Sequence, residues 1–249
     1  MKILVIQQKM IGDVLVSSLL CNNLRKAYPS AQIDYMVYKS TLPVLKGNTS
    51  IDNFILFEKK HRKSKLKFFK LIFDIRKEKY DLVIDAYSKL ESWLTVLFSN
   101  ASTKISYKKF GRTFLYTHNV PLCDEPKSNI GLVIERRLSL LSPLNLNTRI
   151  EVEPSLLVTE EERKIVAKLF NDFKLDTTKK TVMISIVGSR FNKTYPLNYM
   201  ARVIDLIAAK VDANILFNYI PKQRELAKKV YNYCSEETKK NIYFELLGK

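Results

Sequence analysis

The 249-residue sequence is poor in the residues on which several common sites depend. Its 6 glycines stand far apart, where average usage of about 7% would give roughly 17. No G-x-G-x-x-G or Walker A loop can therefore be formed, which excludes the common dinucleotide-binding and P-loop motifs. The 2 histidines and 3 scattered cysteines provide no basis for a histidine metal cage, a zinc knuckle, a disulfide framework or a Ser-His-Asp triad. We expect no metal and no cofactor, and the cysteine usage fits a reducing compartment.

Long apolar runs are also missing. The apolar run at the N-terminus is too short for a signal peptide, because the polar residues Gln7, Gln8 and Lys9 follow it directly. Nowhere do about 18 consecutive apolar residues occur, so we expect no membrane-spanning helix. These features favour a cytoplasmic protein.

Acidic residues are few relative to basic ones. The 42 lysines and arginines against 25 aspartates and glutamates give a net charge of +17, which favours polyanionic partners. We expect no nucleic acid among them, because the basic residues are spread over both halves and no nucleic-acid-binding signature occurs. Between Lys59 and Lys79, apolar residues alternate with cations, as on surfaces that contact anionic lipid head groups. The alternative is that these residues, Leu66, Phe69, Ile72 and Phe73, pack on a sheet while the lysines are solvated.

Strand and helix patterns alternate along the chain. Strand patterns cover residues 2–6, 33–38, 53–57, 82–85 and 104–107, and helix patterns cover 14–28, 43–46, 64–79, 89–98 and 131–142. This order predicts a parallel sheet with helices on both faces. The periodicity breaks between Asn145 and Glu153, which divides the chain into predicted domains 1–153 and 154–249.

The alternation resumes in the second domain. Thr159 and the acidic residues 160–162 predict the start of a helix that runs to Phe173. Strand patterns follow at 182–187, 213–217 and 242–246, and helix patterns at 196–210 and 221–233. We expect the strand at 182–187 to be buried. About three strands are few for a doubly wound sheet, which usually has five or six. We therefore expect a second α/β domain that is incomplete.

Two loops follow predicted strands at the sheet edge where ligands bind in such folds. In the first, Gly12 would let the backbone approach a ligand, and Asp13 could be a helix cap, a metal ligand or a general base. In the second, Gly188, Ser189 and Lys193 precede a predicted helix, and a cation beside a helix N-terminus suits an anion. The alternative for this second loop is a solvated basic segment.

An ordered set of short motifs resembles the family 9 glycosyltransferases, the ADP-heptose:lipopolysaccharide heptosyltransferases and their relatives. The motifs are KILVI at 2–6, GDVL at 12–15, LRKAYP at 24–29, AQID at 31–34, YDLVID at 80–85, KISY at 104–107, GS at 188–189 and KTYP at 193–196, with a weaker match in PKQRELA at 221–227. The resemblance covers the whole chain.

This resemblance implies a GT-B-like α/β fold of two Rossmann-like parallel-sheet domains, an acceptor-side N-terminal one and a donor-side C-terminal one. It implies an inverting, metal-independent transfer of a heptose or similar sugar from a nucleotide-diphosphate sugar, with ADP-heptose as the expected donor, to the lipopolysaccharide inner core. The expected partners are that donor, the lipopolysaccharide core or a similar anionic glycolipid, and the anionic inner face of the cytoplasmic membrane, where the protein would be peripheral.

Residue roles follow from the matching positions. The resemblance implies that Asp13 is the general base and that Lys193 neutralises the charge growing on the leaving group. The full expected site consists of catalytic Asp13, acceptor-side Lys9 and Gly12, and donor-binding Gly188, Ser189, Lys193 and Gln223.

Three departures from the family pattern weaken this expectation. Gln223 stands where relatives usually have Glu, and Gln7 and Gln8 stand where an Arg is usual. The sequence also ends before the Asp-Ser-Gly and His-Ala segments of the family. The alternative hypothesis is a catalytically impaired short member that binds an anionic glycolipid or a partner transferase.

Overall fold

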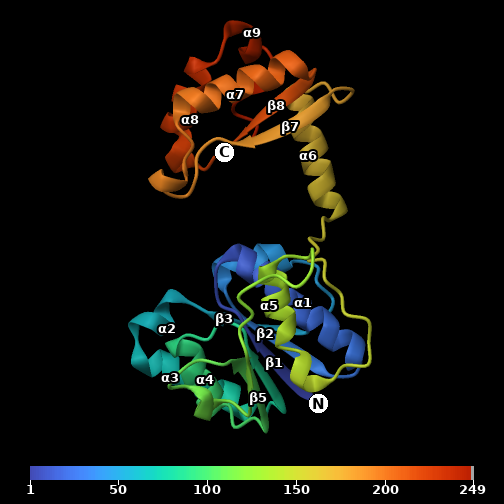
Figure 1. The fold of residues 1–249 in the computed structure, drawn as a ribbon, viewed down its shortest axis with the longest axis vertical. Helices are drawn as coiled ribbons and strands as arrows, with labels where there is room; N and C mark the ends of the chain where they lie inside the picture. Colours follow the sequence, from blue (N-terminus) through green and yellow to red (C-terminus); the bar gives the residue numbers. More distant parts are fainter. Residues whose placement is uncertain (248–249) are drawn as a thin grey trace. The chain divides into compact units, whose positions relative to one another are not determined.

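The computed structural model describes residues 1–247. The chain forms two compact units: unit 1 comprises Met1–Val158, and unit 2 begins at Thr159. Each unit has its own parallel sheet with helices packed on it (Figure 1). In residues 1–247, no helix is both long enough and apolar enough to cross a bilayer.

The sheet of unit 1 has six parallel strands in the order β3-β2-β1-β4-β5-β6. They are β1 Lys2–Ile6, β2 Gln32–Tyr38, β3 Asn53–Phe57, β4 Leu82–Asp85, β5 Thr103–Tyr107 and β6 His118–Val120. The order reverses between β1 and β4, and in open parallel sheets a crevice for ligands forms outside the carboxyl ends at such a point. The fold thus places the loop after β1 at the expected binding edge.

Helices cover both faces of this sheet (Figure 1). Ile3 and Val5 of β1 pack with α1 on one face, and Leu4 and Ile6 pack with α3 and α4 on the other. This alternation explains why β1 reads as a continuous apolar run. The helical segments are α1 Ile11–Ala27, η1 Lys39–Leu45, α2 Lys59–Lys63, α3 Lys65–Lys77, α4 Leu90–Phe98, η2 Thr113–Leu115, α5 Leu132–Ser139 and η3 Ser142–Leu144.

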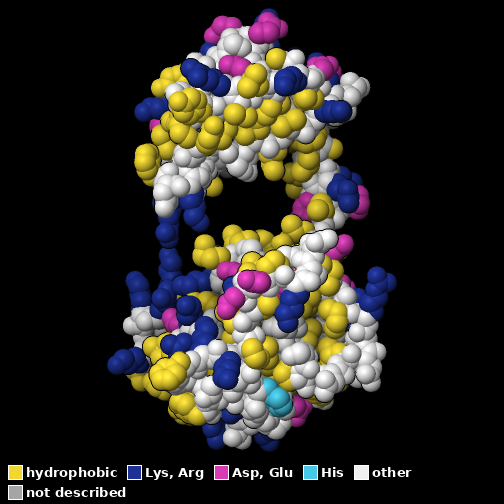
Figure 2. Space-filling model, viewed as in Figure 1, with side chains coloured by type: hydrophobic (Ala, Val, Ile, Leu, Met, Phe, Trp, Pro, Cys, Tyr) yellow, Lys and Arg dark blue, Asp and Glu magenta, His cyan; other side chains and the backbone are white. Residues whose placement is uncertain are grey.

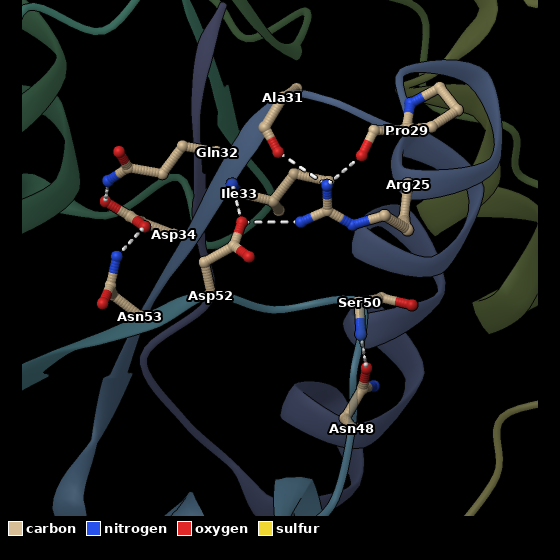
Figure 3. A network of polar contacts seen from close by, with 10 residues as sticks. All are labelled: Arg25, Pro29, Ala31, Gln32, Ile33, Asp34, Asn48, Ser50, Asp52 and Asn53. Carbon is tan, nitrogen blue, oxygen red and sulfur yellow. Dashed lines mark hydrogen bonds and ion pairs between the residues drawn. The ribbon is translucent and has the colours of Figure 1, made fainter.

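A polar network closes the amino end of β2, away from the carboxyl edge (Figure 3). The Asp52 carboxylate lies 2.6 Å from Arg25 Nη2 and accepts the Ile33 N–H at 2.6 Å. Arg25 also donates to the carbonyls of Pro29 and Ala31, at 2.8 and 2.6 Å. The network joins the end of α1 to the starts of β2 and β3, so its charges are used within the fold.

Asp34 of β2 is buried in the same region. Its carboxylate accepts hydrogen bonds from the amides of Gln32 and Asn53, each at 2.9 Å (Figure 3). It also accepts a hydrogen bond from the hydroxyl of Tyr80. A buried carboxylate with several donors is stabilised as a structural element. Asp34 is therefore not a candidate for chemistry.

Unit 2 contains a smaller parallel sheet in the order β7-β8-β9. Its core consists of side chains such as Ile204, Ile215, Phe217 and Val230 from the central strand and two helices. The elements are α6 Glu160–Asp172, β7 Lys180–Ser185, η4 Phe191–Lys193, α7 Leu197–Lys210, β8 Ala213–Asn218, η5 Pro221–Gln223, α8 Arg224–Tyr233, α9 Glu236–Lys239 and β9 Ile242–Tyr243.

The start of α6 agrees with its sequence pattern. The Thr159 hydroxyl accepts the N–H of Glu162 at 3.2 Å, and the Glu162 carboxylate accepts the Thr159 N–H at 2.8 Å. Each partner satisfies a backbone donor that a helix start otherwise leaves free. The predicted cap at Thr159 is confirmed.

Some predicted elements differ from the structure. The strand expected at 182–187 is β7, Lys180–Ser185, and none of its residues is buried, because within residues 1–247 it pairs only with β8. The strand expected at 242–246 is limited to Ile242–Tyr243. The stretch around Pro43 is the 3-10 segment η1, since a proline inside a helix cannot donate the usual backbone bond. The short elements α2 and β6 were not predicted.

Candidate functional site

Asp13 lies in the first turn of α1, just after the carboxyl end of β1. Its Oδ2 accepts the backbone N–H of Met10 at 3.3 Å, so the carboxylate caps the helix as one sequence interpretation expected. The side chain nevertheless keeps 39% of its surface exposed. A carboxylate that is fixed at a binding edge and still reachable has the placement that a general base needs.

Arg137 of α5 reaches the other oxygen of Asp13. Its Nη2 lies 3.1 Å from Asp13 Oδ1, and its Nη1 donates to the Tyr107 hydroxyl at 2.8 Å. The Tyr107 hydroxyl in turn donates to the carbonyl of Arg136 at 3.0 Å. Sequence reasoning missed Arg137, because it is 124 positions from Asp13 and looks like an ordinary cation in the last turn of a helix.

A cavity of about 750 Å³ opens beside the loop that leads to Asp13. Lys9, Met10 and Ile11 of this loop line it, with Tyr38 and Phe57 from the ends of β2 and β3. The remaining lining residues are Lys39, Ser40, Thr41, Glu58, Lys59, Lys60 and Arg62. Apolar walls with a predominantly cationic rim suit an anionic molecule that also has apolar parts.

The structure places the predicted acceptor-side residues at this cavity or next to it. Lys9 lines the cavity, and its ammonium lies 5.6 Å from the centre of the Tyr38 ring. Gly12 faces open space, since nothing lies within 4 Å of the position that a Cβ would take there. The β1–α1 loop thus brings Lys9, Gly12 and Asp13 to one edge of unit 1.

Asp85 ends β4 at the same edge and is fully buried. Its carboxylate accepts the N–H groups of Tyr87 and Ser88, at 3.0 and 2.7 Å, and the hydroxyl of Tyr116 at 2.7 Å. Burial raises the pKa of Asp85, and these hydrogen bonds oppose the shift. Nearby, burial and the neighbouring cations Lys89 and Arg112 lower the pKa of Lys109.

Gln7 and Gln8 follow β1 and are also buried. The side-chain amide of Gln8 has no hydrogen-bond partner among the described residues, and neither has the side-chain oxygen of Gln7. Buried side-chain amides usually form hydrogen bonds. The polar groups of Gln7 and Gln8 are thus buried next to the carboxyl end of β1 without such bonds among the described residues.

In unit 2, the loop after β7 is closed tightly around Gly188. A Cβ at this position would lie 2.2 Å from the carbonyl oxygen of Lys193, so only glycine fits. The side-chain amide of Gln223 donates to the Gly188 carbonyl at 3.2 Å and accepts the N–H of Ile220 at 3.2 Å. The fold therefore brings Gly188, Lys193 and Gln223 together.

Ser189 and Lys193 are exposed in this loop. Lys193 ends η4, and α7 begins four residues later at Leu197. Within residues 1–247, neither Arg190 nor Lys193 forms an ion pair with a carboxylate. Two free cations and a hydroxyl ahead of a helix are suited to an anion such as a diphosphate.

Comparison with protein families gives a match over most of the chain. The family model described as glycosyltransferase family 9 (heptosyltransferase) matches residues 68–249. Lipopolysaccharide heptosyltransferase 3 of Escherichia coli is 32% identical over 148 residues, which cover 56% of this chain and 42% of that protein. The protein of the same name from strain K12 is 30% identical over 143 residues, covering 54% and 40%. The match therefore spans less than half the length of these relatives.

Solved structures with a similar fold include three glycosyltransferases. The family 9 glycosyltransferase of Veillonella parvula gives a TM-score of 0.80 at 19% identity, covering 94% of this chain and 67% of that one. E. coli ADP-heptose lipopolysaccharide heptosyltransferase II gives 0.72 at 21% identity, covering 97% and 71%. E. coli heptosyltransferase WaaC with ADP-2-deoxy-2-fluoro heptose gives 0.65 at 17% identity, covering 94% and 75%. These matches confirm the predicted GT-B-like α/β class with two Rossmann-like parallel sheets.

Proposed function

Because the chain belongs to glycosyltransferase family 9, we propose that it transfers a heptose, or a similar sugar, from a nucleotide-diphosphate sugar to the lipopolysaccharide inner core. The observation that carries this proposal is the family match over residues 68–249. The placement of Asp13 at the binding edge of a parallel sheet supports it independently. Relatives named lipopolysaccharide heptosyltransferase support the choice of acceptor.

In the proposed reaction, Asp13 acts on the acceptor. Its carboxylate takes the proton of the acceptor hydroxyl while the hydroxyl oxygen forms a bond to the anomeric carbon of the sugar. The bond between that carbon and the diphosphate oxygen breaks in the same step, and its electron pair leaves with the diphosphate. A single displacement of this kind inverts the configuration at the anomeric carbon.

Unit 2 holds the donor in this proposal. Ser189 donates a hydrogen bond to the diphosphate, and the Lys193 ammonium offsets the negative charge that grows on it as it leaves. Gly188 lets the backbone come close to the phosphates, and Gln223 fixes the Gly188 carbonyl. We propose ADP-heptose as the donor, since a structural neighbour of this chain is a heptosyltransferase with an ADP-fluoroheptose.

The cavity beside Lys9 is the proposed binding region for the acceptor. Its cationic rim suits the acidic groups of a core saccharide, and its apolar walls suit sugar faces and lipid. The proposal places the protein in the cytoplasm, where its acceptor is presented at the inner face of the membrane. A metal is not needed, because Lys193 supplies the positive charge at the leaving group.

Peripheral binding to the anionic membrane face is supported by α3. Phe68 and Ile72 of this helix pack on the sheet, whereas Leu66 and Phe73 are 85% and 53% exposed. Leu66, Phe69 and Phe73 thus form a second apolar stripe on the outer surface, here called the α3 stripe. Figure 2 shows hydrophobic patches bordered by Lys and Arg on this side of unit 1. Such a surface suits anionic lipid.

A transfer assay with the 249-residue chain tests the proposal. We expect mass spectrometry to show addition of one heptose to a heptose-deficient lipopolysaccharide acceptor in the presence of ADP-heptose. EDTA should leave the rate unchanged, and Asp13→Ala should abolish transfer. Binding of the lipopolysaccharide acceptor, with neither transfer nor saturable binding of ADP-heptose, would support the impaired member that binds an anionic glycolipid instead. A chain that transfers no heptose and binds neither ADP-heptose nor the lipopolysaccharide acceptor would contradict the proposed transfer and the glycolipid-binding alternative.

A further inference from the structure

Arg137 is the one residue whose side chain holds the Asp13 carboxylate from another element of unit 1. We propose that Arg137 is a positioning residue for Asp13. Its guanidinium fixes the Asp13 carboxylate so that Oδ2 of Asp13 receives the proton of the acceptor hydroxyl. This inference rests on the proposed function of Asp13. It concerns a residue of α5 that no sequence motif pointed to.

The two carboxylate oxygens have different surroundings. Oδ1 lies 3.1 Å from a charged guanidinium nitrogen, while the one contact of Oδ2 within residues 1–247 is the longer one of 3.3 Å with the Met10 N–H. A guanidinium contact to a carboxylate is charge-assisted, and it holds Oδ1 in a defined direction. Oδ2 is then left as the less engaged oxygen, available for a hydroxyl of the acceptor.

Arg137 is itself anchored. Its side chain is only 14% exposed, and its second terminal nitrogen donates to the Tyr107 hydroxyl at 2.8 Å. Tyr107 lies at the end of β5, and its hydroxyl is fixed by the backbone of α5 through Arg136. A continuous chain of contacts therefore leads from the sheet and α5 to the carboxylate at the start of α1.

The geometry fits a positioning role better than a purely structural one. The α1 and α5 face of the sheet is already packed by a large apolar core, so the helices do not depend on this pair for their docking. Arg137 Nε is buried without a hydrogen-bond partner among the described residues, which is unfavourable for stability. A residue that orients a reacting group can be retained although it lowers stability, because misplacement of that group by about 1 Å can slow a reaction on the order of 100-fold.

Arg136 provides a matched control on the same helix. Its Nη2 lies 3.4 Å from Asp124 and its Nε donates to the Cys123 carbonyl at 2.6 Å, so its side chain makes an ion pair away from Asp13. Both arginines belong to the last turn of α5. Loss of either cation changes the net charge equally, but only loss of Arg137 releases the base.

Transfer kinetics of the full chain test the proposal. We expect Arg137→Met to lower kcat on the order of 100-fold, with KM for both substrates and the melting temperature nearly unchanged. Arg137→Lys should restore part of kcat, and Arg136→Met should resemble the wild type. Because Arg137 acts through Asp13, Asp13→Asn and the double variant Asp13→Asn/Arg137→Met should share the same residual single-turnover rate.

Several outcomes would overturn this role. The first is a double variant that reacts more slowly than Asp13→Asn alone. The second is a raised KM for the acceptor at unchanged kcat in Arg137→Met. The third is a loss of kcat in Arg136→Met as large as that in Arg137→Met. An Arg137→Met variant as active as the wild type would contradict the positioning role alone. A wild-type chain without any transfer activity would contradict the proposed function and this inference with it.

Discussion

Asp13 caps α1 and is also the general base in the proposed reaction, two roles that the sequence presented as alternatives. Its Oδ2 caps α1 through the Met10 N–H, while the side chain remains partly exposed beside Arg137. The cap fixes the backbone of the loop, and the exposure keeps the carboxylate reachable. An asparagine in its place keeps an oxygen for the cap and loses the proton acceptor, so Asp13→Asn is the sharper test of a base than Asp13→Ala.

Gly188 offers a direct prediction for the donor loop. Gly188→Ala places a methyl group against the Lys193 carbonyl, so the loop must open. We expect the affinity for ADP, measured by calorimetry, to fall at least tenfold, since the cation and the backbone donors are no longer aligned.

Gly12→Ala is the matched control, because a Cβ there meets nothing within 4 Å, and it should leave ADP affinity unchanged. Unaltered ADP binding by Gly188→Ala would show that this loop does not hold the diphosphate.

Sequence patterns located the loops at residue scale but not the contacts made across the fold. Gly12, Asp13, Gly188 and Lys193 follow strands, and their type and place were enough to select them. The contact of Arg137 with Asp13 depends on the docking of α5, and the cavity by Lys9 depends on the ends of three strands. Such long-range juxtapositions leave no local pattern in a single sequence.

At the scale of elements, α2 carries a histidine that makes stability depend on pH. His61 is buried, and its Nδ1 accepts the Glu58 N–H at 3.0 Å. Burial lowers the pKa of His61, as do the nearby cations Lys60 and Lys67, while Glu58 opposes the shift. The unfolded chain therefore binds this proton more readily than the folded one, so stability is full above the unfolded pKa and declines as pH falls through the folded pKa.

We predict that the free energy of unfolding, measured with urea, decreases between about pH 7.5 and pH 5.5. His61→Asn keeps an acceptor for the Glu58 N–H and cannot titrate, so its profile should be flatter than that of the wild type. Other titrating groups, such as Asp85, are present in both proteins and cancel in the comparison. Parallel profiles would contradict the role of His61.

The α3 stripe predicts lipid binding by one element. We expect the chain to sediment with vesicles that contain phosphatidylglycerol and not with neutral phosphatidylcholine vesicles, and salt should weaken the binding. Leu66→Ser/Phe73→Ser should reduce the bound fraction several-fold, because both side chains are exposed and belong to the stripe.

Leu206→Ser is the matched control, since Leu206 is 60% exposed on α7 of unit 2. Equal binding by the stripe variant and the wild type, or equal binding to neutral vesicles, would exclude this surface.

Most elements could be predicted because apolar periodicity is strong in the cores. The strands at 53–57 and 82–85 have the predicted bounds, and α3 lies within the predicted 64–79. The failures are short or peripheral elements. His118–Val120 is a three-residue edge strand without alternation. Lys180–Ser185 contains the apolar run 182–184, yet it lies at the edge of the sheet that residues 1–247 form. Burial at an edge depends on what pairs with it, which the segment itself does not encode.

At the scale of the whole molecule, the proposed function assigns proton transfer to unit 1 and donor binding to unit 2. Unit 1 presents a carboxylate, an arginine and a cation-rimmed cavity, and unit 2 presents a glycine loop with two exposed cations. The net charge of +17 suits a nucleotide donor, an acidic saccharide and an anionic membrane alike. Fold and family could be inferred from ordered motifs, whereas the pairing of residues within each site could not.

The central claim is a division of labour, in which Asp13 performs proton transfer and Lys193 holds the donor. Titration of ADP-heptose into the wild type, Asp13→Asn and Lys193→Ala, combined with single-turnover transfer by each protein, tests it most directly. Asp13→Asn should bind the donor as the wild type does and transfer about 100- to 10,000-fold more slowly. Lys193→Ala should lose both binding and transfer. An Asp13→Asn variant that transfers at the wild-type rate, or a Lys193→Ala variant that binds and transfers normally, would contradict the account.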